Sequence, residues 1–336
     1  MVKIVDVARH AGVSTATVSR VLNRNMRVAG DLRERVERAV ADLGYSMNVA
    51  ARSLRTQRSS KILISVPDIS NPFFADVIRG AEEAARRAGF SVMLGDTGND
   101  PALEGHYASL LARREVDGLV ILGHRVPSTI IDLLARNDPA MVPVAHGCEY
   151  SPDLRVPSVH IDNVAAGGDA ARHLLELGHR RIGVVTGPLD SPLSRDRLAG
   201  VRSAIEKARQ GELLLREGDF SIEAGYAHGQ ALALEGVTAI FCFSDEMALG
   251  ALRALGDAGL RCPDDVSVIG FDDIRFAAFA QPRLTTIAQP REAIGRRTVE
   301  LLVHRLEGGT GDLGHIALPH QLIVRASTGP CPTPAR

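Results

Sequence analysis

The chain of 336 residues contains no tryptophan, and aromatic residues make up only 4% of it. Its four cysteines (Cys148, Cys242, Cys262 and Cys331) are widely separated and lack the close pairs of a metal site, which favours free thiols in a reducing compartment. No apolar run approaches the roughly 18 residues of a membrane helix, and the start, "MVKIVDVARH", has no apolar signal-peptide core. These absences argue against secretion and membrane spanning, and they predict a cytoplasmic protein.

Sequence patterns of common enzymes are also absent. The chain has no GxxxxGK[ST], HExxH, GxSxG or GxGxxG pattern. The sequence therefore does not indicate a phosphate-binding loop, the metal-binding helix of a zinc protease or the nucleophile turn of a hydrolase. We therefore expect no catalytic residue, no cofactor and no metal site. An enzyme that uses a cleft, such as a nucleoside hydrolase, is the weakest of the functional classes considered.

The formal net charge of -1 conceals an uneven distribution. Residues 1–60 hold 11 Lys and Arg against five Asp and Glu, whereas residues 61–336 hold 28 against 35. A basic start on an acidic body indicates a polyanionic partner for the start. A merely solvated basic face would give the same totals, so charge alone leaves both interpretations open.

The N-terminal part shows the spacing of three short helices. Apolar residues recur at the i, i+3, i+4 and i+7 positions of a helix over 4–11, and Gly12 is placed to end it. Ser14 is placed to cap a second helix over about 15–22, and a third is expected over about 31–43. Two short helices joined by a glycine-containing turn and followed by a third predict a helix-turn-helix domain.

The second helix carries residues with the chemistry for DNA on the side opposite its apolar face. At 100° per residue, Val18, Val21 and Leu22 share one face, and Ala16 and Arg20 point the opposite way. Short hydroxyl side chains reach phosphates, and an arginine can bond to guanine in the major groove. The pattern predicts a double-stranded DNA partner, with a small three-helix protein-binding module as the alternative.

The segment "IVDVARHAGVSTATVSRVLN" resembles, almost without a break, the DNA-binding domain of the LacI/GalR family of bacterial transcription regulators. The resemblance implies that Thr15, Ala16 and Arg20 face bases. Polar residues that would help to seat the DNA backbone are Ser14, Thr17, Ser19 and Asn23. It also implies a homodimer that binds an operator and a small effector.

The resemblance further identifies "ARSL" as the hinge helix of that family, which folds on DNA and pairs with its copy in a dimer. It implies that Arg52 flanks the DNA backbone and that Leu54 enters a minor-groove step, where an inserted apolar side chain kinks the duplex. A plain core contact of Leu54 is the alternative. Two residues depart from the family pattern: Ala29 stands where a serine usually caps the third helix, and Met47 replaces a proline before the hinge.

Beyond this segment, short apolar strands alternate with helices in two series. The first begins with "KILISV", and the second begins after Asp162 with a helix over 163–177 and the strand "RIGVVTG". Such alternation predicts an α/β fold of two similar lobes with parallel sheets, and the family resemblance implies a periplasmic-binding-protein-like body. The expected domains are a helix-turn-helix head (1–46), a hinge helix and linker (47–60), a two-lobed effector-binding and dimerisation domain (61–329) and a disordered tail (330–336).

Ligands of open parallel sheets bind at the carboxyl ends of the strands, where this chain places aromatic and charged residues. Aromatic faces can stack on a flat ring, and charged groups make strong hydrogen bonds to hydroxyls. The candidate effector-binding residues are Phe73, Phe74, Asp162, Arg197, Phe220, Asp245 and Asp272. Simpler roles remain open: a core position for Phe74, a helix cap for Asp245, and a structural ion pair between Arg197 and Asp272.

Four stretches resemble members of the family that respond to a nucleoside: "VPDISNPFF", "GPLDSPLSRDRLAG", "GDFSIEAG" and "GFDDIRFAAFAQPRLTTIAQPR". The resemblance implies a base stacked near Phe73 or Phe220 and a ribose held by Arg197 and Asp272. The expected function is a transcriptional repressor whose DNA affinity is controlled by a nucleoside such as cytidine. A sugar or purine effector, or a small-molecule transport protein, is the alternative.

Overall fold

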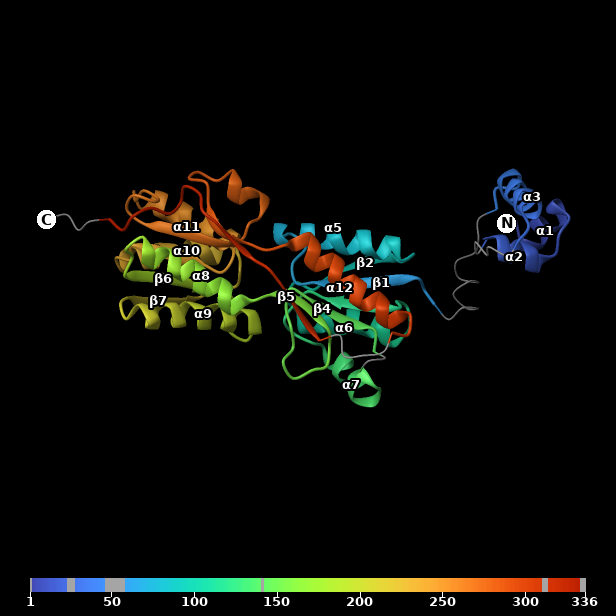
Figure 1. Cartoon of the computed structure of the whole chain (residues 1–336), viewed down its shortest axis with the longest axis horizontal. Coiled ribbons are helices and arrows are strands. Elements are labelled where there is room, and N and C mark those ends of the chain that lie inside the picture. The colour runs from blue at the N-terminus through green and yellow to red at the C-terminus, as the bar shows by residue number, and fades with distance from the viewer. Residues whose placement is uncertain (1, 23–27, 46–57, 140–141, 310–313, 333–336) are drawn as a thin grey trace. The chain divides into compact units, whose positions relative to one another are not determined.

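The computed structural model describes residues 2–22, 28–45, 58–139, 142–309 and 314–332 (Figure 1). The chain divides into two compact units, Met1–Ser59 and Ser60–Arg336. Three predicted DNA-contacting residues, Asn23, Arg52 and Leu54, lie outside the described residues. Within the described residues, no helix has both the length and the apolar character needed to cross a membrane.

The first unit contains three helices, α1 (Ile4–Ala11), α2 (Thr15–Leu22) and α3 (Gly30–Asp42). Each helix buries one apolar stripe, as an amphipathic helix in a small domain must. The fully buried Val7, Val18 and Val36 come one from each helix and form the centre of a single small core. The three predicted helices are therefore confirmed.

Local hydrogen bonds build the junctions between these helices. Gly12 ends α1 with φ 63°, and a Cβ there would lie 2.7 Å from the Arg35 guanidinium. Arg35 Nη2 donates to the carbonyl oxygen of Ala11 at 2.7 Å, which ties α3 to the end of α1. Ser14 Oγ accepts a hydrogen bond from a backbone N–H of α2 at 3.1 Å, which confirms the predicted cap. Ala29 precedes α3 without a side-chain cap, also as predicted.

The second unit contains two six-stranded sheets, one in each lobe. The strand order of the first sheet is β11 (His315–Leu318), β5 (Ser158–Ile161), β4 (Val144–Gly147), β3 (Gly118–Ile121), β1 (Lys61–Val66) and β2 (Ser91–Asp96). That of the second is β12 (Gln321–Ile323), β10 (Thr285–Ala288), β9 (Ser267–Asp272), β8 (Ala239–Cys242), β6 (Arg181–Thr186) and β7 (Glu212–Glu217). Neighbouring strands are parallel, as predicted, except that β12 runs antiparallel to β10.

Helices cover both faces of each sheet, as parallel strands require. The first lobe carries α5 (Pro72–Arg87), α6 (Pro101–Ala112), α7 (Ser128–Arg136) and α12 (Arg291–Leu306). The second carries α8 (Asn163–Glu176), α9 (Pro192–Ala208), α10 (Ile222–Leu234), α11 (Asp245–Asp257) and the short 3-10 helix η2 (Arg275–Ala278). The helix pairs α5–α12, α8–α9 and α10–α11 pack closely through glycines; a Cβ at Gly167 of α8 would lie 2.2 Å from the carbonyl oxygen of Arg197 in α9.

The chain crosses between the lobes three times, after β5, after β10 and after β11 (Figure 1). The first crossing, at Asp162, is the restart that the alternating pattern predicted. The sequence did not predict that α12 and β11 return to the first lobe. The apolar pattern of a helix or strand shows that the segment packs on a sheet, but it does not specify which of the two sheets. As a result, residues late in the chain complete both lobes.

The tail departs from the expectation of disorder from residue 330 onward. The backbone N of Cys331 donates a hydrogen bond to the carbonyl oxygen of Leu177 at 2.8 Å, so residues 330–332 are attached to the second lobe. Backbone hydrogen bonding offsets the entropy that a proline-rich end would otherwise retain. Residues 333–336 lie outside the described part of the chain.

Candidate functional site

The first candidate site is the exposed face of α2. Thr15, Ala16 and Arg20, the residues predicted to face bases, are all exposed to solvent. Val18 and Val21 on the opposite side are buried in the core of the head, and this fixes the orientation of the helix. Thr17 Oγ1 lies 3.0 Å from Ser14 Oγ at the start of the helix, so two of the hydroxyl groups predicted to contact the DNA backbone also contact each other.

The second candidate site is a cavity of ≈ 490 Å³ between the two lobes of the second unit. Its lining comes from segments at the carboxyl ends of β1 to β4 in one lobe and of β6 to β10 in the other. This is the location at which open parallel sheets bind ligands. The cavity is of the size that small organic ligands occupy.

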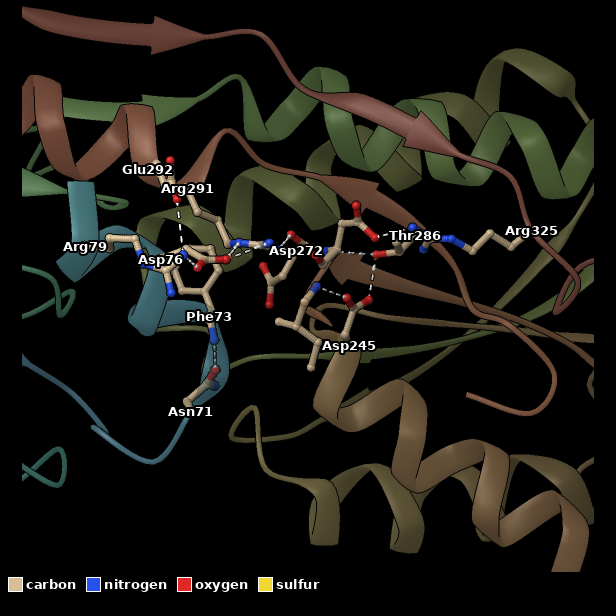
Figure 2. Close-up of polar contacts among 12 residues, drawn as sticks. Asn71, Phe73, Asp76, Arg79, Asp245, Asp272, Thr286, Arg291, Glu292 and Arg325 are labelled. Atoms are coloured by element: carbon tan, nitrogen blue, oxygen red, sulfur yellow. Dashed lines mark hydrogen bonds and ion pairs between the residues drawn. The ribbon is translucent and has the colours of Figure 1, made fainter. Parts of the chain in front are cut away.

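Aromatic rings from both lobes line this cavity. Phe73 and Phe74 open α5 and contact each other edge to face, with centroids 5.1 Å apart. Asn71 Oδ1 accepts a hydrogen bond from the backbone N of Phe73 at 2.9 Å and thereby caps the helix that presents the two rings (Figure 2). From the other lobe, the Phe220 ring packs so closely on Gly187 that a Cβ there would lie 1.9 Å from the ring.

Arg197 is 4% exposed and is held at the cavity wall by its neighbours. Its Nε donates to Asn163 Oδ1 at 2.9 Å, its Nη1 donates to the carbonyl oxygen of Phe243 at 2.7 Å, and its guanidinium lies 3.6 Å from the centre of the Phe271 ring. Burial lowers the pKa of Arg197 to about 10, so it remains charged at neutral pH. The ion pair with Asp272, which was the alternative role for Arg197, is not formed, and Nη2 of Arg197 has no hydrogen-bond partner among the described residues.

Asp272 ends β9 and is 7% exposed. Gln289 Nε2 donates to its carboxylate at 2.7 Å, and Arg291 Nη1 donates to its backbone carbonyl at 2.6 Å. Figure 2 shows Asp272 between Arg291 and the sheet of the second lobe. Burial raises the pKa of Asp272 to about 6, although Arg197 favours the ionised form.

Two of the predicted effector residues, Asp162 and Asp245, are not part of the cavity lining. Asp162 is exposed and caps α8 by accepting a hydrogen bond from the backbone N of Ala165 at 2.9 Å. Asp245 is fully buried and accepts hydrogen bonds from Thr286 Oγ1 at 2.6 Å and from the backbone N of Ile274 at 2.8 Å (Figure 2). Both carboxylates are occupied by the backbone or the core, so we withdraw them as effector contacts.

Several lining residues were missed, and five of them are acidic: Asp68, Glu149, Asp190, Asp219 and Glu246. Glu149 is buried and accepts hydrogen bonds from Ser191 Oγ at 2.6 Å and from the backbone N of Leu193 at 3.4 Å, both across the lobes. Burial raises the pKa of Glu149 and that of Glu246 to about 7. Glu149 follows β4, which the sequence pattern did not predict. Glu246 is next to Asp245 on a helix, where adjacent side chains point about 100° apart.

Among the described residues, no group of three or more His, Cys, Asp or Glu side chains is arranged to hold a metal ion. The lining of the cavity therefore offers aromatic surfaces, one buried guanidinium and several carboxylates. This combination suits a small organic ligand with a flat ring and hydroxyl or amino groups.

Comparison with known proteins finds a matching family model in each of the two units. Residues 3–48 match the model of bacterial regulatory proteins of the lacI family, and residues 171–328 match that of a periplasmic binding protein-like domain. The chain is 41% identical to the HTH-type transcriptional repressor CytR of Escherichia coli (strain K12) over 97% of this chain and 96% of that protein. It is 36% identical to the HTH-type transcriptional repressor PurR of Haemophilus influenzae (strain PittEE), over 97% and 98% of the two chains.

Among solved structures, the chain matches the lac repressor dimer bound to operator and the anti-inducer ONPF. The TM-score is 0.86 at 30% identity, and the match covers 98% of this chain and 99% of that one. Identity at this level over nearly the whole length goes beyond a shared fold. The chain therefore belongs to the lacI family of bacterial regulatory proteins.

Proposed function

We propose that the protein is a cytoplasmic transcriptional repressor that binds operator DNA as a homodimer and responds to a nucleoside such as cytidine in the cavity between its lobes. The observation that carries the proposal is one chain with two sites: the exposed polar face of α2 and a ligand-sized cavity with aromatic walls. The names of the relatives CytR and PurR, both HTH-type transcriptional repressors, support the regulatory class.

The α2 face supplies the DNA contacts in this proposal. In a dimer, two copies of α2 would enter successive major grooves of a near-palindromic operator. Arg20 would contact a base edge, and the hydroxyls of Ser14, Thr17 and Ser19 would contact phosphates. The hinge segment, with Leu54 as a minor-groove wedge, would order only on DNA, so its folding entropy is offset by DNA contacts.

The cavity supplies the response to the effector. A base would stack on Phe73 or Phe220, with Phe74 beside it, and Arg197 and Asp272 would bond to the ribose hydroxyls. Two hydrogen bonds cross between the lobes: Ser191 Oγ donates to the lining residue Glu149, and Tyr150 Oη donates to Asp196 at 2.8 Å. A ligand that favours one lobe arrangement would shift the equilibrium between arrangements and hence DNA affinity.

A thermal-shift screen of nucleosides, purine bases and sugars with the full chain tests the proposal. A ligand that binds the folded state raises the melting temperature, and the same ligand should change the retention of operator DNA in a gel shift. Asp272→Asn, which keeps the shape of the side chain, should abolish that response and leave DNA binding by the ligand-free protein intact. A sugar or purine that alone raises the melting temperature would replace the nucleoside as effector.

The transport-protein alternative is separated by the same gel shift. A repressor should bind operator DNA specifically, and sedimentation should show two chains on one operator. A protein that binds the nucleoside but no DNA, or binds operator as a single chain, would contradict the proposal.

A further inference from the structure

The cavity between the lobes carries more carboxylates than cations. Its lining includes the acidic residues Asp68, Glu149, Asp190, Asp219, Glu246 and Asp272, against the two arginines Arg125 and Arg197. A site built for a phosphate normally offers arginine, lysine or a helix N-terminus with free N–H groups. The charge balance here is of the opposite sign.

Both arginines are already engaged. Arg125 forms a two-pronged ion pair with Glu104, with Nη2 to Oε1 at 2.9 Å and Nε to Oε2 at 3.1 Å. Arg197 is buried, donates to Asn163 and Phe243, and electrostatically balances Asp272 and Glu149. The lining therefore holds six carboxyl groups against two guanidinium groups, and each guanidinium already makes hydrogen bonds within the protein.

Two of the carboxylates, Asp68 and Glu246, come from opposite lobes. Asp68 follows β1 and is fixed by hydrogen bonds to its Oδ1 from the backbone N and the Oγ of Ser70, at 2.8 and 2.6 Å. Glu246 lies in the first turn of α11 and is half-buried, with no hydrogen bond or ion pair to the described residues. After burial, Asp68 is the largest cause of the raised pKa of Glu246, so the two charges act on the same space.

We propose that Asp68 and Glu246 select an uncharged ligand, a nucleoside rather than its phosphate ester, at this cavity. The inference rests on the proposed function, because it specifies the ligand of the same site. A phosphate would enter a partly desolvated space in which carboxyl groups outnumber guanidinium groups, and there the repulsion between like charges is much stronger than in water. The hydroxyl and amino groups of a nucleoside can instead donate hydrogen bonds to these carboxylates.

Calorimetry with the full chain tests the selection with matched pairs: cytidine and cytidine 5′-monophosphate, adenosine and its 5′-monophosphate, and ribose and ribose 5-phosphate. For the pair whose neutral member binds, the phosphate ester should bind about tenfold more weakly or worse, which corresponds to about 1.4 kcal/mol. Glu246→Gln combined with Asp68→Asn should narrow that gap severalfold, because it removes two charges and keeps the side-chain shapes.

Glu206→Gln is the matched control, since Glu206 is an exposed residue of α9 outside the cavity lining, and it should leave the gap unchanged. Equal binding of the two members of a pair, tighter binding of the ester, or a gap unaffected by the double variant would each overturn the inference while the cavity remains an effector site. Binding by ribose and not by the nucleosides would refute the nucleoside assignment. Failure of every pair to bind would refute this inference and the nucleoside effector of the proposed function, whereas the gel shift with operator DNA tests the repressor class separately.

Discussion

Asp272 and Phe220 hold their backbones at φ 114° and φ 72°, in a region that residues other than glycine rarely adopt. Such conformations persist where the surroundings hold them, and they concentrate at binding sites. For Asp272 the support is visible: Gln289 donates to its carboxylate and Arg291 to its carbonyl oxygen. Both residues line the cavity, so the strained backbone belongs to the proposed effector site.

Asp245 is a buried polar residue whose removal should destabilise the second lobe. Asp245→Ala would leave the Thr286 hydroxyl and the backbone N–H of Ile274 buried without an acceptor. We expect a loss of about 2–4 kcal/mol in the free energy of unfolding, because each unsatisfied buried group costs on the order of 1–3 kcal/mol. Urea denaturation measures it, with the neighbouring Glu246→Gln as a comparison. A loss below about 1 kcal/mol would show that these donors find other partners.

Arg20 is the residue that should determine base preference in the head. Arg20→Ala removes an exposed guanidinium from α2 and should cost roughly 1–3 kcal/mol of operator affinity. Binding to a library of operators mutated one base pair at a time should show relaxed preference at one position per half-site. A uniform loss across all sequences would indicate a phosphate contact instead.

At the scale of elements, helix starts are the features that local sequence determines well. Asn71, Ser191, Ser221 and Ser244 each cap a helix of the second unit with a side-chain acceptor. A cap needs only one oxygen placed two or three residues before an N–H group, so distant residues do not enter. In α9, for example, the helix begins at Pro192, directly after its cap Ser191.

The uncapped start of α3 offers a way to stabilise the head. Ala29 has the extended backbone of a cap residue, with φ -55° and ψ 145°, but no side-chain acceptor. Ala29→Ser should raise the local stability of α3 by about 0.5–1 kcal/mol. Hydrogen exchange of α3 amides in the full chain measures the change. Ala29→Val, which adds bulk without an acceptor, should give no protection; equal protection by both variants would rule out capping as the cause.

The residues around the cavity show what the pattern of strands and helices cannot predict, namely which side chains face the cavity. In three pairs of residues that are adjacent in sequence, one residue lines the cavity or bonds to a lining residue, and the other bonds elsewhere in the protein. The pairs are Asp162 and Asn163, Asp245 and Glu246, and Asp272 and Asp273. Asn163 bonds to Arg197, and Asp273 accepts a hydrogen bond from Arg325 at 2.6 Å. A pattern of strand ends predicts that such a pair is near the site. Only the backbone twist at each strand end decides which side chain faces the cavity.

At the scale of the whole molecule, buried ionisable groups couple stability to pH in opposite directions. The raised pKa values of Glu149, Glu246 and Asp272 mean that the folded state binds protons more readily than the unfolded chain. Their contribution to the free energy of unfolding therefore falls as pH rises from about 5 to about 7. His146, whose pKa burial lowers to about 4, acts in the opposite sense, because the unfolded chain takes up its proton first.

Glu246→Gln tests the contribution of one group with a raised pKa to this pH dependence. The variant lacks the carboxylate that must ionise in the cavity, so its stability relative to the wild type should increase as pH rises from 5 to 8. Thermal unfolding at several pH values measures the difference, and Glu206→Gln at an exposed position of α9 should show no such trend. A constant difference at all pH values would show that Glu246 ionises in the folded protein as it does in the unfolded chain.

The sequence alone determined the class of the protein: three amphipathic helices, two series of alternating strands and helices, and a polar α2 face. These features depend on neighbours within one or two turns of the chain, so local spacing is sufficient to reveal them. The nearly continuous match of the first helices to one family added the expected DNA and effector sites.

Tertiary structure decided the rest. It returned α12 and β11 to the first lobe, attached Cys331 to Leu177, and placed Glu149 and Glu246 in the cavity while it removed Asp162 and Asp245 from it. Each outcome depends on which distant surface a segment meets and how the backbone turns there. Burial and charge at the cavity arise only when both lobes are assembled, because each lobe supplies half of the lining.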